Sequence, residues 1–251
     1  MATRFLKILP GLAYGFVINF PPISSTQSPP NNVSITSFDS EFRTIICKEI
    51  AKGRYLGPFP LSLIEQVLGP YQSSPLSIIP KQGHPGQFRV IQNFLFPTNP
   101  SPPFPNPAIN HYILAEDFPT TWGKFSVIYN LITHLPPGSE AAIRDVAEAY
   151  CTIPLHPSQW PAGVVQISDT LGCTDTNLAF GSTPAAGMYG HISDACCEIF
   201  RLNGIGPVDK WVDDHIFFRI RTEFLEKYNK HRNEQNKNIL RNTSSPYQSG
   251  G

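Results

Sequence analysis

The sequence predicts an α+β fold in which an antiparallel sheet is backed by helices. Residues 210–218 place two adjacent aspartates between apolar, β-branched and aromatic residues, the pattern of two strands joined by a turn. A second short apolar run, residues 141–143, also leads to an aspartate. After residue 181, apolar side chains recur at helical intervals as far as Ile199. Two strands that each present a carboxylate at one end can lie side by side in one sheet.

Length and composition set the first bounds. With 251 residues the chain can bury a core in one domain or in two. Lysine plus arginine equals aspartate plus glutamate at 19 each, so binding to nucleic acid would need a local basic face. The apolar opening, residues 5–20, contains Lys7 and Pro10 and is too short to span a bilayer. We therefore expect no association with a membrane.

The cysteines indicate the compartment. They are odd in number and have no C-x-x-C spacing; the five are Cys47, Cys151, Cys173, Cys196 and Cys197. This usage favours reduced thiols and supports neither a disulfide framework nor a zinc site. We expect an intracellular protein, cytoplasmic or nuclear, and not a secreted one.

The other elements follow from periodicity and from helix breakers. Residues 1–44 form a Pro/Ser-rich N-terminal leader, which we expect to pack loosely on the body. Helical spacing predicts two helices that stop at Gly53 and Gly69, and β-rich runs around glycine-containing breaks predict hairpins. The expected elements after the leader are a helix over 42–50, a helix over 61–68, a hairpin over 74–93, a proline-rich connector over 96–111, a helix over 121–135, a hairpin over 164–178, a helix over 182–199, a polar helix over 219–241 and a disordered tail over 241–251.

Asp145, Asp213 and Asp214 form the candidate chemical centre. A buried, unpaired aspartate is costly, so a pair at the tip of an apolar hairpin needs a reason. A tight turn is one reason, because aspartate is a common turn residue. A metal site is the other, because strands that bring the three side by side would offer oxygen ligands to hard divalent cations. Two such ions about 4 Å apart are the usual device for in-line phosphoryl displacement.

Three motifs occur in a telling order: Asp-Val-Ala-Glu-Ala-Tyr at 145–150, Leu-Ala-Phe-Gly-Ser-Thr-Pro-Ala at 178–185 and Val-Asp-Asp at 212–214. Their order and spacing resemble the reverse transcriptases of retrotransposons, among which a DIRS-like element is one candidate. The resemblance covers residues 45–240 and implies a right-hand polymerase, with a palm made of an antiparallel sheet backed by helices and with fingers. The family's thumb has no room in the 33 residues after Phe218, so we expect it to be absent and the chain to be truncated.

The resemblance assigns roles to the charged residues. Asp145 and Asp213 would be the principal ligands of two Mg²⁺ ions, for which Mn²⁺ can substitute, and Asp214 would have a secondary role beside them. Lys81 and Arg89, on the hairpin expected in the fingers, match a lysine and an arginine that contact the triphosphate. Charge-assisted contacts to phosphate are the physical reason for such residues. Two solvated surface charges on a hairpin are the alternative.

Three further residues would border the nucleotide. Tyr150 matches an aromatic residue that lies under the sugar and excludes a ribose 2′-hydroxyl, with an ordinary core tyrosine as the alternative. Gly181 would let the backbone approach the templating base or the nucleotide closely. Phe180 stands where some viral relatives have glutamine, and its side chain has no polar group with which to make the contact that a glutamine would make.

The resemblance implies template-directed DNA synthesis, with an RNA/DNA primer-template and deoxynucleoside triphosphates as partners. RNA is the expected template. Two alternatives remain open. One is a folded but inactive remnant that binds nucleic acid or protein, and the other is a palm-like nucleotidyl enzyme without a strict template. Palm surface left uncovered by a missing thumb would also favour self-association.

Overall fold

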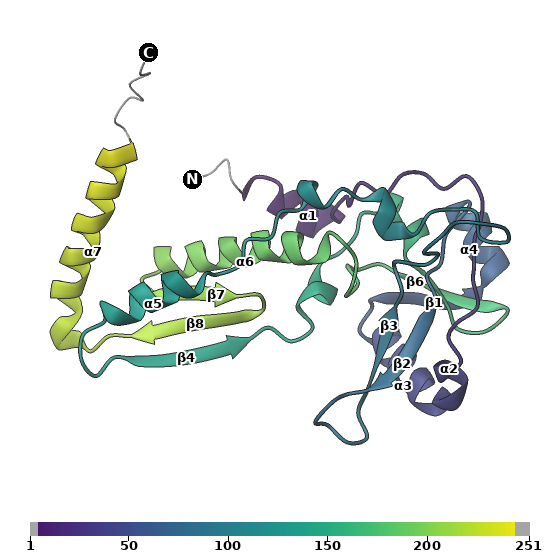
Figure 1. Cartoon of the computed structure of the whole chain (residues 1–251), viewed down its shortest axis with the longest axis horizontal. Coiled ribbons are helices and arrows are strands. Elements are labelled where there is room, and N and C mark those ends of the chain that lie inside the picture. The colour runs from purple at the N-terminus through teal and green to yellow at the C-terminus, as the bar shows by residue number, and fades with distance from the viewer. Residues whose placement is uncertain (1–4, 244–251) are drawn as a thin grey trace, which may run out of the picture. The chain divides into compact units, whose positions relative to one another are not determined.

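The structure of the chain is a computed structural model, which describes the backbone of residues 5–243 and the side chains of residues 5–234. Helices and antiparallel strands alternate along it (Figure 1). They form two compact units. The first unit holds the residues up to 121 together with 147–192, and the second holds 122–146 together with the residues from 193 onward. This mixture of helices and antiparallel strands agrees with the predicted α+β class.

The first unit contains two small antiparallel sheets, one with the strand order β1-β6-β5 and one with the pair β2-β3. Helix α6 (Ala185–Leu202) begins in this unit and continues into the second. The other elements of the first unit are α1 (Ile8–Tyr14), α2 (Ser34–Ser37), α3 (Asp39–Ala51), β1 (Tyr55–Pro60), α4 (Leu61–Leu68), β2 (Leu76–Pro80), β3 (Phe88–Gln92), β5 (Val164–Gln166), β6 (Leu171–Asp175) and the short 3₁₀ helices η2 (Ile109–Tyr112), η3 (Ala115–Asp117), η4 (Ala149–Thr152) and η5 (Pro157–Ala162).

The main core of the first unit lies between helix α3 and the two sheets. Phe42 and Ile46, four residues apart on one face of α3, pack into a cluster with Leu76 and Ile78 of β2 and with Val165 of β5. The predicted helices over 42–50 and 61–68 are confirmed as parts of α3 and as α4. The hairpin predicted over 74–93 is confirmed as β2 and β3.

The N-terminal leader packs more tightly than the sequence predicts. Ile18 and Phe20 are only 3% and 5% exposed, so the expectation of loose packing is wrong for this part of the leader. Their backbone N–H groups both donate to the side-chain oxygen of Gln159, at 3.2 and 2.9 Å. Because a buried backbone N–H needs a partner, Gln159 is what lets this irregular segment enter the interior.

The second unit is a three-stranded antiparallel sheet with the strand order β4-β8-β7. Figure 1 shows helices α5 and α6 alongside this sheet, and α7 follows directly after β8. The predicted hairpin around residues 210–218 is confirmed as β7 and β8. The elements are α5 (Phe125–Thr133), β4 (Glu140–Asp145), β7 (Val208–Trp211), β8 (Asp214–Arg219) and α7 (Thr222–Thr243).

The ends of several elements differ from the prediction, those of α5 and β6 among them. Helix α5 is shorter than the expected 121–135 and has no buried residue. Strand β6 ends at Asp175, three residues earlier than expected, because the Asp175 carboxylate accepts a bond from the backbone N–H of Asn177 at 3.0 Å and turns the chain. Most of the predicted tail, residues 244–251, lies outside the described residues. Across residues 5–243, no helix is long and apolar enough to cross a membrane.

Candidate functional site

The register of the second unit's sheet brings Asp145 and Asp214 together. They are direct cross-strand partners on β4 and β8, so their side chains point to the same face of the sheet. The next residue pair along the two strands, Val146 and Asp213, is hydrogen-bonded: the N–H of Val146 donates to the carbonyl oxygen of Asp213 at 3.1 Å. Asp145 and Asp214 therefore form a non-hydrogen-bonded pair, the kind in which side chains lie closer together. Two of the three predicted carboxylates are thus neighbours.

Asp213, the third carboxylate, lies in the two-residue turn between β7 and β8. The turn starts at Val212, whose φ of 53° is in the left-handed region. A positive φ at the first central residue is the pattern of a II′ hairpin turn, which normally has glycine there. A β-branched residue in this conformation is strained. The strained turn places Asp213 next to Asp214 at the end of the sheet.

The donor set suits a hard divalent cation in its chemistry. The carboxylates of Asp145 and Asp214 repel each other, because like charges directly opposite each other in a sheet are unfavourable. None of the three aspartates forms an ion pair with a described residue that would offset this repulsion. Among the described side chains, no group of three or more His, Cys, Asp or Glu is arranged so that it could hold a metal ion. Mg²⁺ typically binds through one or two carboxylates, with water and substrate phosphates completing its shell. The pair Asp145–Asp214 fits that mode of binding.

A second group of predicted residues meets in the first unit. The ring of Tyr150 stacks on Phe180, with centroids 5.7 Å apart and planes 27° apart, and contacts Tyr189 edge-on at 5.9 Å. Phe180 is 69% exposed, so one aromatic face of this group is open to solvent. Gly181 follows with a φ of 95°, a backbone conformation that favours glycine.

Asn110 is a site residue that the sequence did not reveal. Its side chain spans the loop at Gly181: its amide group donates to the Gly181 carbonyl at 3.0 Å, and its oxygen accepts from the N–H of Thr183 at 2.9 Å. Both bonds connect residues more than 70 positions apart in the chain. They hold the 180–183 loop against helix η2. No local pattern around Asn110 could have indicated this.

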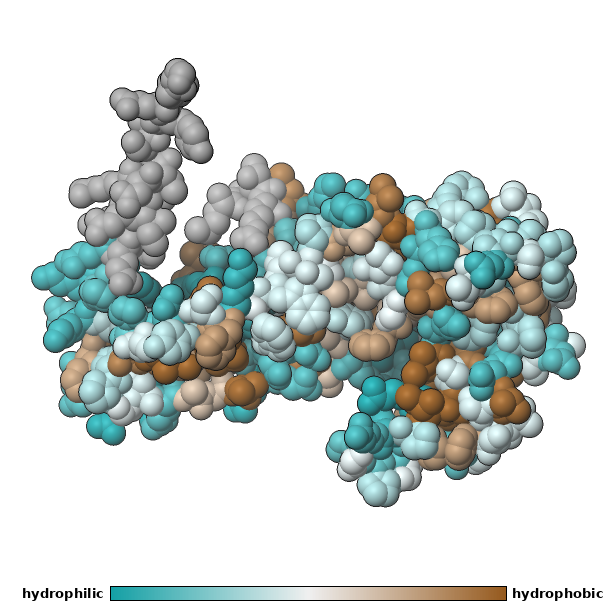
Figure 2. Space-filling model, viewed as in Figure 1, coloured by the Kyte–Doolittle hydropathy of each residue, from teal (hydrophilic) through white to brown (hydrophobic). Residues whose placement is uncertain are grey.

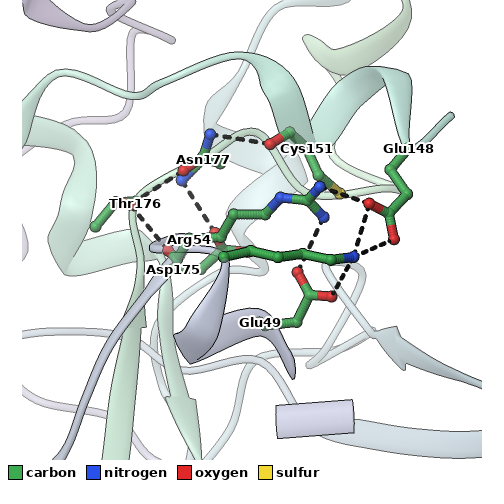
Figure 3. A network of polar contacts seen from close by, with 8 residues as sticks. Glu49, Arg54, Glu148, Cys151, Asp175, Thr176 and Asn177 are labelled. Carbon is green, nitrogen blue, oxygen red and sulfur yellow. Dashed lines mark hydrogen bonds and ion pairs between the residues drawn. The ribbon is translucent and has the colours of Figure 1, made fainter. Parts of the chain in front are cut away.

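Glu148 was also missed, and it anchors the segment between Asp145 and Tyr150. Its carboxylate binds Lys52 at 2.6 and 2.8 Å and Arg54 at 2.6 Å (Figure 3). Hydrogen bonds from Lys52 and from Arg54 lower the pKa of Glu148 below its ordinary value. Glu148 has a left-handed backbone, with φ 57° and ψ 38°, immediately before η4, the short helix that carries Tyr150.

Arg54 extends this network toward β6. Its guanidinium also binds Glu49 at 3.0 Å, and its carbonyl oxygen accepts from both the N–H and the hydroxyl of Thr176. The side chain of the next residue, Asn177, donates to the carbonyl of Cys151 at 3.0 Å (Figure 3). Hydrogen bonds therefore hold the chain on both sides of Tyr150, at Glu148 and at Cys151. The network fixes the backbone that presents the Tyr150 ring.

The hairpin of β2 and β3 places Lys81 and Arg89 on one face. Arg89 is the cross-strand partner of Ile79. Lys81 follows Ile79 by two residues along the chain, directly after the end of β2. Because side chains alternate along a strand, Lys81 and Arg89 are diagonal neighbours on the face opposite Ile78 and Leu76, which enter the core. Neither has an ion-pair partner among the described residues. Both cations are therefore available to an anion.

Comparison with known proteins bears on the fold. No family model matches the chain, and no curated protein matches its sequence. Among solved structures, the native protease–reverse transcriptase of prototype foamy virus matches 89% of the chain with a TM-score of 0.54 at 11% identity. The foamy viral enzyme in complex with an RNA/DNA hybrid matches 84% with a TM-score of 0.55, also at 11% identity. The fold is reverse-transcriptase-like. The chain spans about a quarter of the length of these two proteins, 25% and 24% respectively.

The predicted site residues thus form three groups. Asp145 and Asp214 pair within the second unit, with Asp213 in the adjoining turn. Tyr150 and Phe180 stack next to Gly181 in the first unit. The two predicted phosphate-binding cations share one face of the β2–β3 hairpin, also in the first unit.

Proposed function

We propose that the chain is the fingers-and-palm part of a retroelement reverse transcriptase, of which a DIRS-like element remains one candidate source. It would extend a primer with deoxynucleotides according to an RNA or DNA template. The observation that carries the proposal is the direct pairing of Asp145 with Asp214, with Asp213 in the next turn, on a reverse-transcriptase-like fold. Paired acidic residues at one end of a sheet have no stabilising role without a cation, whereas two-metal phosphoryl transfer requires them.

The three aspartates would hold two Mg²⁺ ions, with Mn²⁺ as a substitute. When bound, such ions lower the pKa of an attacking hydroxyl and stabilise the charge on a leaving phosphate. The chain's own residues orient the reactants. Lys81 and Arg89 would donate to the triphosphate of the nucleotide from one face of their hairpin. Tyr150, fixed by its stack on Phe180, would lie under the deoxyribose and exclude a 2′-hydroxyl.

The proposed partners are an RNA/DNA primer-template and deoxynucleoside triphosphates. Support for the first is that one structural neighbour is a foamy viral enzyme in complex with an RNA/DNA hybrid. Self-association through the second unit is a further part of the proposal. Figure 2 shows brown, apolar surface where α5 and the β4-β8-β7 sheet lie, and Phe125, Val127 and Ile143 are 78%, 50% and 59% exposed.

Primer extension tests the proposed reaction. The full chain is incubated with an annealed RNA template and DNA primer, the four deoxynucleotides and Mg²⁺ or Mn²⁺, beside the variant Asp213→Ala. The proposal expects extension that follows the template sequence and is lost in the variant. Extension that ignores the template would instead indicate an untemplated nucleotidyl enzyme. Binding of the hybrid without extension would indicate an inactive binding module.

A further inference from the structure

Two polar pairs connect the β7–β8 hairpin to helix α6 within the second unit. Lys210 and His215 are direct cross-strand partners, so both side chains point to the same face of the hairpin. The ammonium group of Lys210 binds the Asp194 carboxylate at 2.8 Å, and the imidazole Nε2 of His215 bonds with the Ser193 hydroxyl at 3.1 Å. The two residues contacted on α6 are therefore consecutive.

Three of these four side chains lie in the interior, and the fourth, that of Asp194, is 17% exposed. Lys210, His215 and Ser193 are 4%, 5% and 1% exposed. A buried ion pair seldom stabilises a fold more than apolar residues of the same volume would, so stability does not explain its presence. The ion pair can instead specify the register of the β7–β8 hairpin. A slip of β7–β8 by one residue would turn Lys210 and His215 to the other face and separate both from α6.

The pairs also stand next to the candidate metal site. One step along each strand, Trp211 and Asp214 form the last rung, and the turn with Val212 and Asp213 follows. Asp214 points to the face opposite Lys210, so Lys210 acts on the carboxylates through the backbone and not by contact. The contacts with α6 hold the Lys210–His215 pair in place. They thereby also fix the positions of the next pair, Trp211 and Asp214, and of the turn.

We propose that the Lys210–Asp194 and Ser193–His215 pairs are positioning elements that hold Asp213 and Asp214 in register with Asp145 for cation binding. The inference rests on the proposed function, because it takes the aspartates as ligands. None of the four residues contacts the cation in this proposal. Their role is to keep the hairpin tip in the arrangement that pairs Asp214 with Asp145 and places Asp213 in the adjoining turn.

Mn²⁺ binding, measured by electron paramagnetic resonance on the full chain, tests this without any need for catalysis. We expect Lys210→Met to weaken Mn²⁺ binding about tenfold or more, the usual effect of losing a residue that orients metal ligands. Electrostatics alone predicts the opposite, because removal of a nearby positive charge would strengthen cation binding. The sign of the change therefore separates positioning from charge.

Two further variants cover the case in which Lys210→Met does not fold. The double variant Lys210→Met/Asp194→Leu removes both charges and should recover the melting temperature while Mn²⁺ binding stays weak. Ser193→Ala removes the bond to His215 with a small change in volume, and should weaken Mn²⁺ binding several-fold. If the double variant recovers both stability and Mn²⁺ binding, the pair is merely structural and the inference is wrong.

Arg201→Met is the matched control. Arg201 also lies on α6, forms an ion pair with Glu198 and donates to the carbonyl of Val208, at the far end of β7. We expect it to leave Mn²⁺ binding unchanged. If wild-type protein shows no Mn²⁺ binding that Asp213→Asn abolishes, the proposed metal site itself fails. If wild-type protein binds and Lys210→Met and Ser193→Ala bind equally well, only the positioning inference fails.

Discussion

Asp145 and Asp214 lie directly opposite each other on two antiparallel strands, with both carboxylates on the same face of the sheet. Such a pair costs stability, because like charges in this position repel. We expect Asp214→Asn to raise the stability of the metal-free protein by about 0.2–1 kcal/mol, the size of a cross-strand charge interaction. Wild-type protein should gain stability from Mg²⁺ or Mn²⁺ by mass action, and the variant should lose this gain.

Thermal melting with and without divalent cation measures both effects. Asp169→Asn is the matched control, since Asp169 is an exposed aspartate in the β5–β6 turn of the first unit. It should leave the metal-dependent gain intact. An equal gain in wild-type protein and in Asp214→Asn would show that the cation acts elsewhere.

The bridge from Glu148 to Lys52 and Arg54 should contribute to stability in a pH-dependent way. The folded state lowers the pKa of Glu148, so its contribution is present above the unfolded pKa and is lost as the pH falls through the folded value. We expect Glu148→Gln to cost at most about 1 kcal/mol at pH 7, because the bridge is partly exposed, and less near pH 3. Urea denaturation at the two pH values measures this.

Glu140→Gln provides the comparison for Glu148→Gln. Glu140 pairs with Arg219, and these side chains are 64% and 77% exposed. Its loss should cost less than the loss of Glu148. A cost for Glu148→Gln that stays the same at both pH values would mean that packing, and not the ion pair, holds the segment.

Local sequence predicted most of the helices and strands, and it predicted that some strands would be neighbours in a sheet. Helix α4 was predicted with the bounds that the structure has, because glycine and proline mark its ends. The sequence predicted two carboxylate-bearing strands side by side, and β4 and β8 are neighbours in the sheet. That Asp145 faces Asp214 and not Asp213 depends on the register of the sheet, which local sequence did not determine. Asn110 and Glu148 escaped prediction because their partners lie more than 70 residues away, so only the folded chain brings them together.

Tyr150 offers a test of nucleotide selection. If its ring lies under the sugar, Tyr150→Val should raise incorporation of ribonucleotides relative to deoxynucleotides, since the smaller side chain leaves room for a 2′-hydroxyl. Single-nucleotide extension with each substrate measures the ratio. Tyr129→Val, at an exposed position on α5, should leave the ratio as it is in wild-type protein. An unchanged ratio in Tyr150→Val would make Tyr150 a core residue only.

Asp175 should make stability depend on pH near neutrality. It is buried beside β1, and desolvation raises its pKa to about 7. Because the folded protein holds this proton more tightly than the unfolded chain, stability should decrease as the pH rises from about 4 to about 7. Asp175→Asn keeps an oxygen for the Asn177 N–H and removes the charge, so its stability should be flatter over this range. Melting temperatures between pH 4 and 8 compare the two proteins.

Val212 gives the last prediction, because its φ of 53° is unfavourable for a β-branched side chain. Strain of this kind costs about 1–3 kcal/mol, and glycine removes it at a cost of about 0.5–1 kcal/mol in chain entropy. We therefore expect Val212→Gly to leave stability unchanged or to raise it by about 1 kcal/mol in urea denaturation. Val146→Gly, at the end of the neighbouring strand and without a positive φ, should lose stability.

The same variant shows what the strained turn is for. If Val212 limits the turn to one conformation, Val212→Gly should bind Mn²⁺ more weakly even though the fold is no less stable, because the turn can then move Asp213 away from Asp214. Weaker binding with equal or greater stability would mean that the fold gives up stability to hold the carboxylates in place. Stronger binding would mean that the strain works against the site.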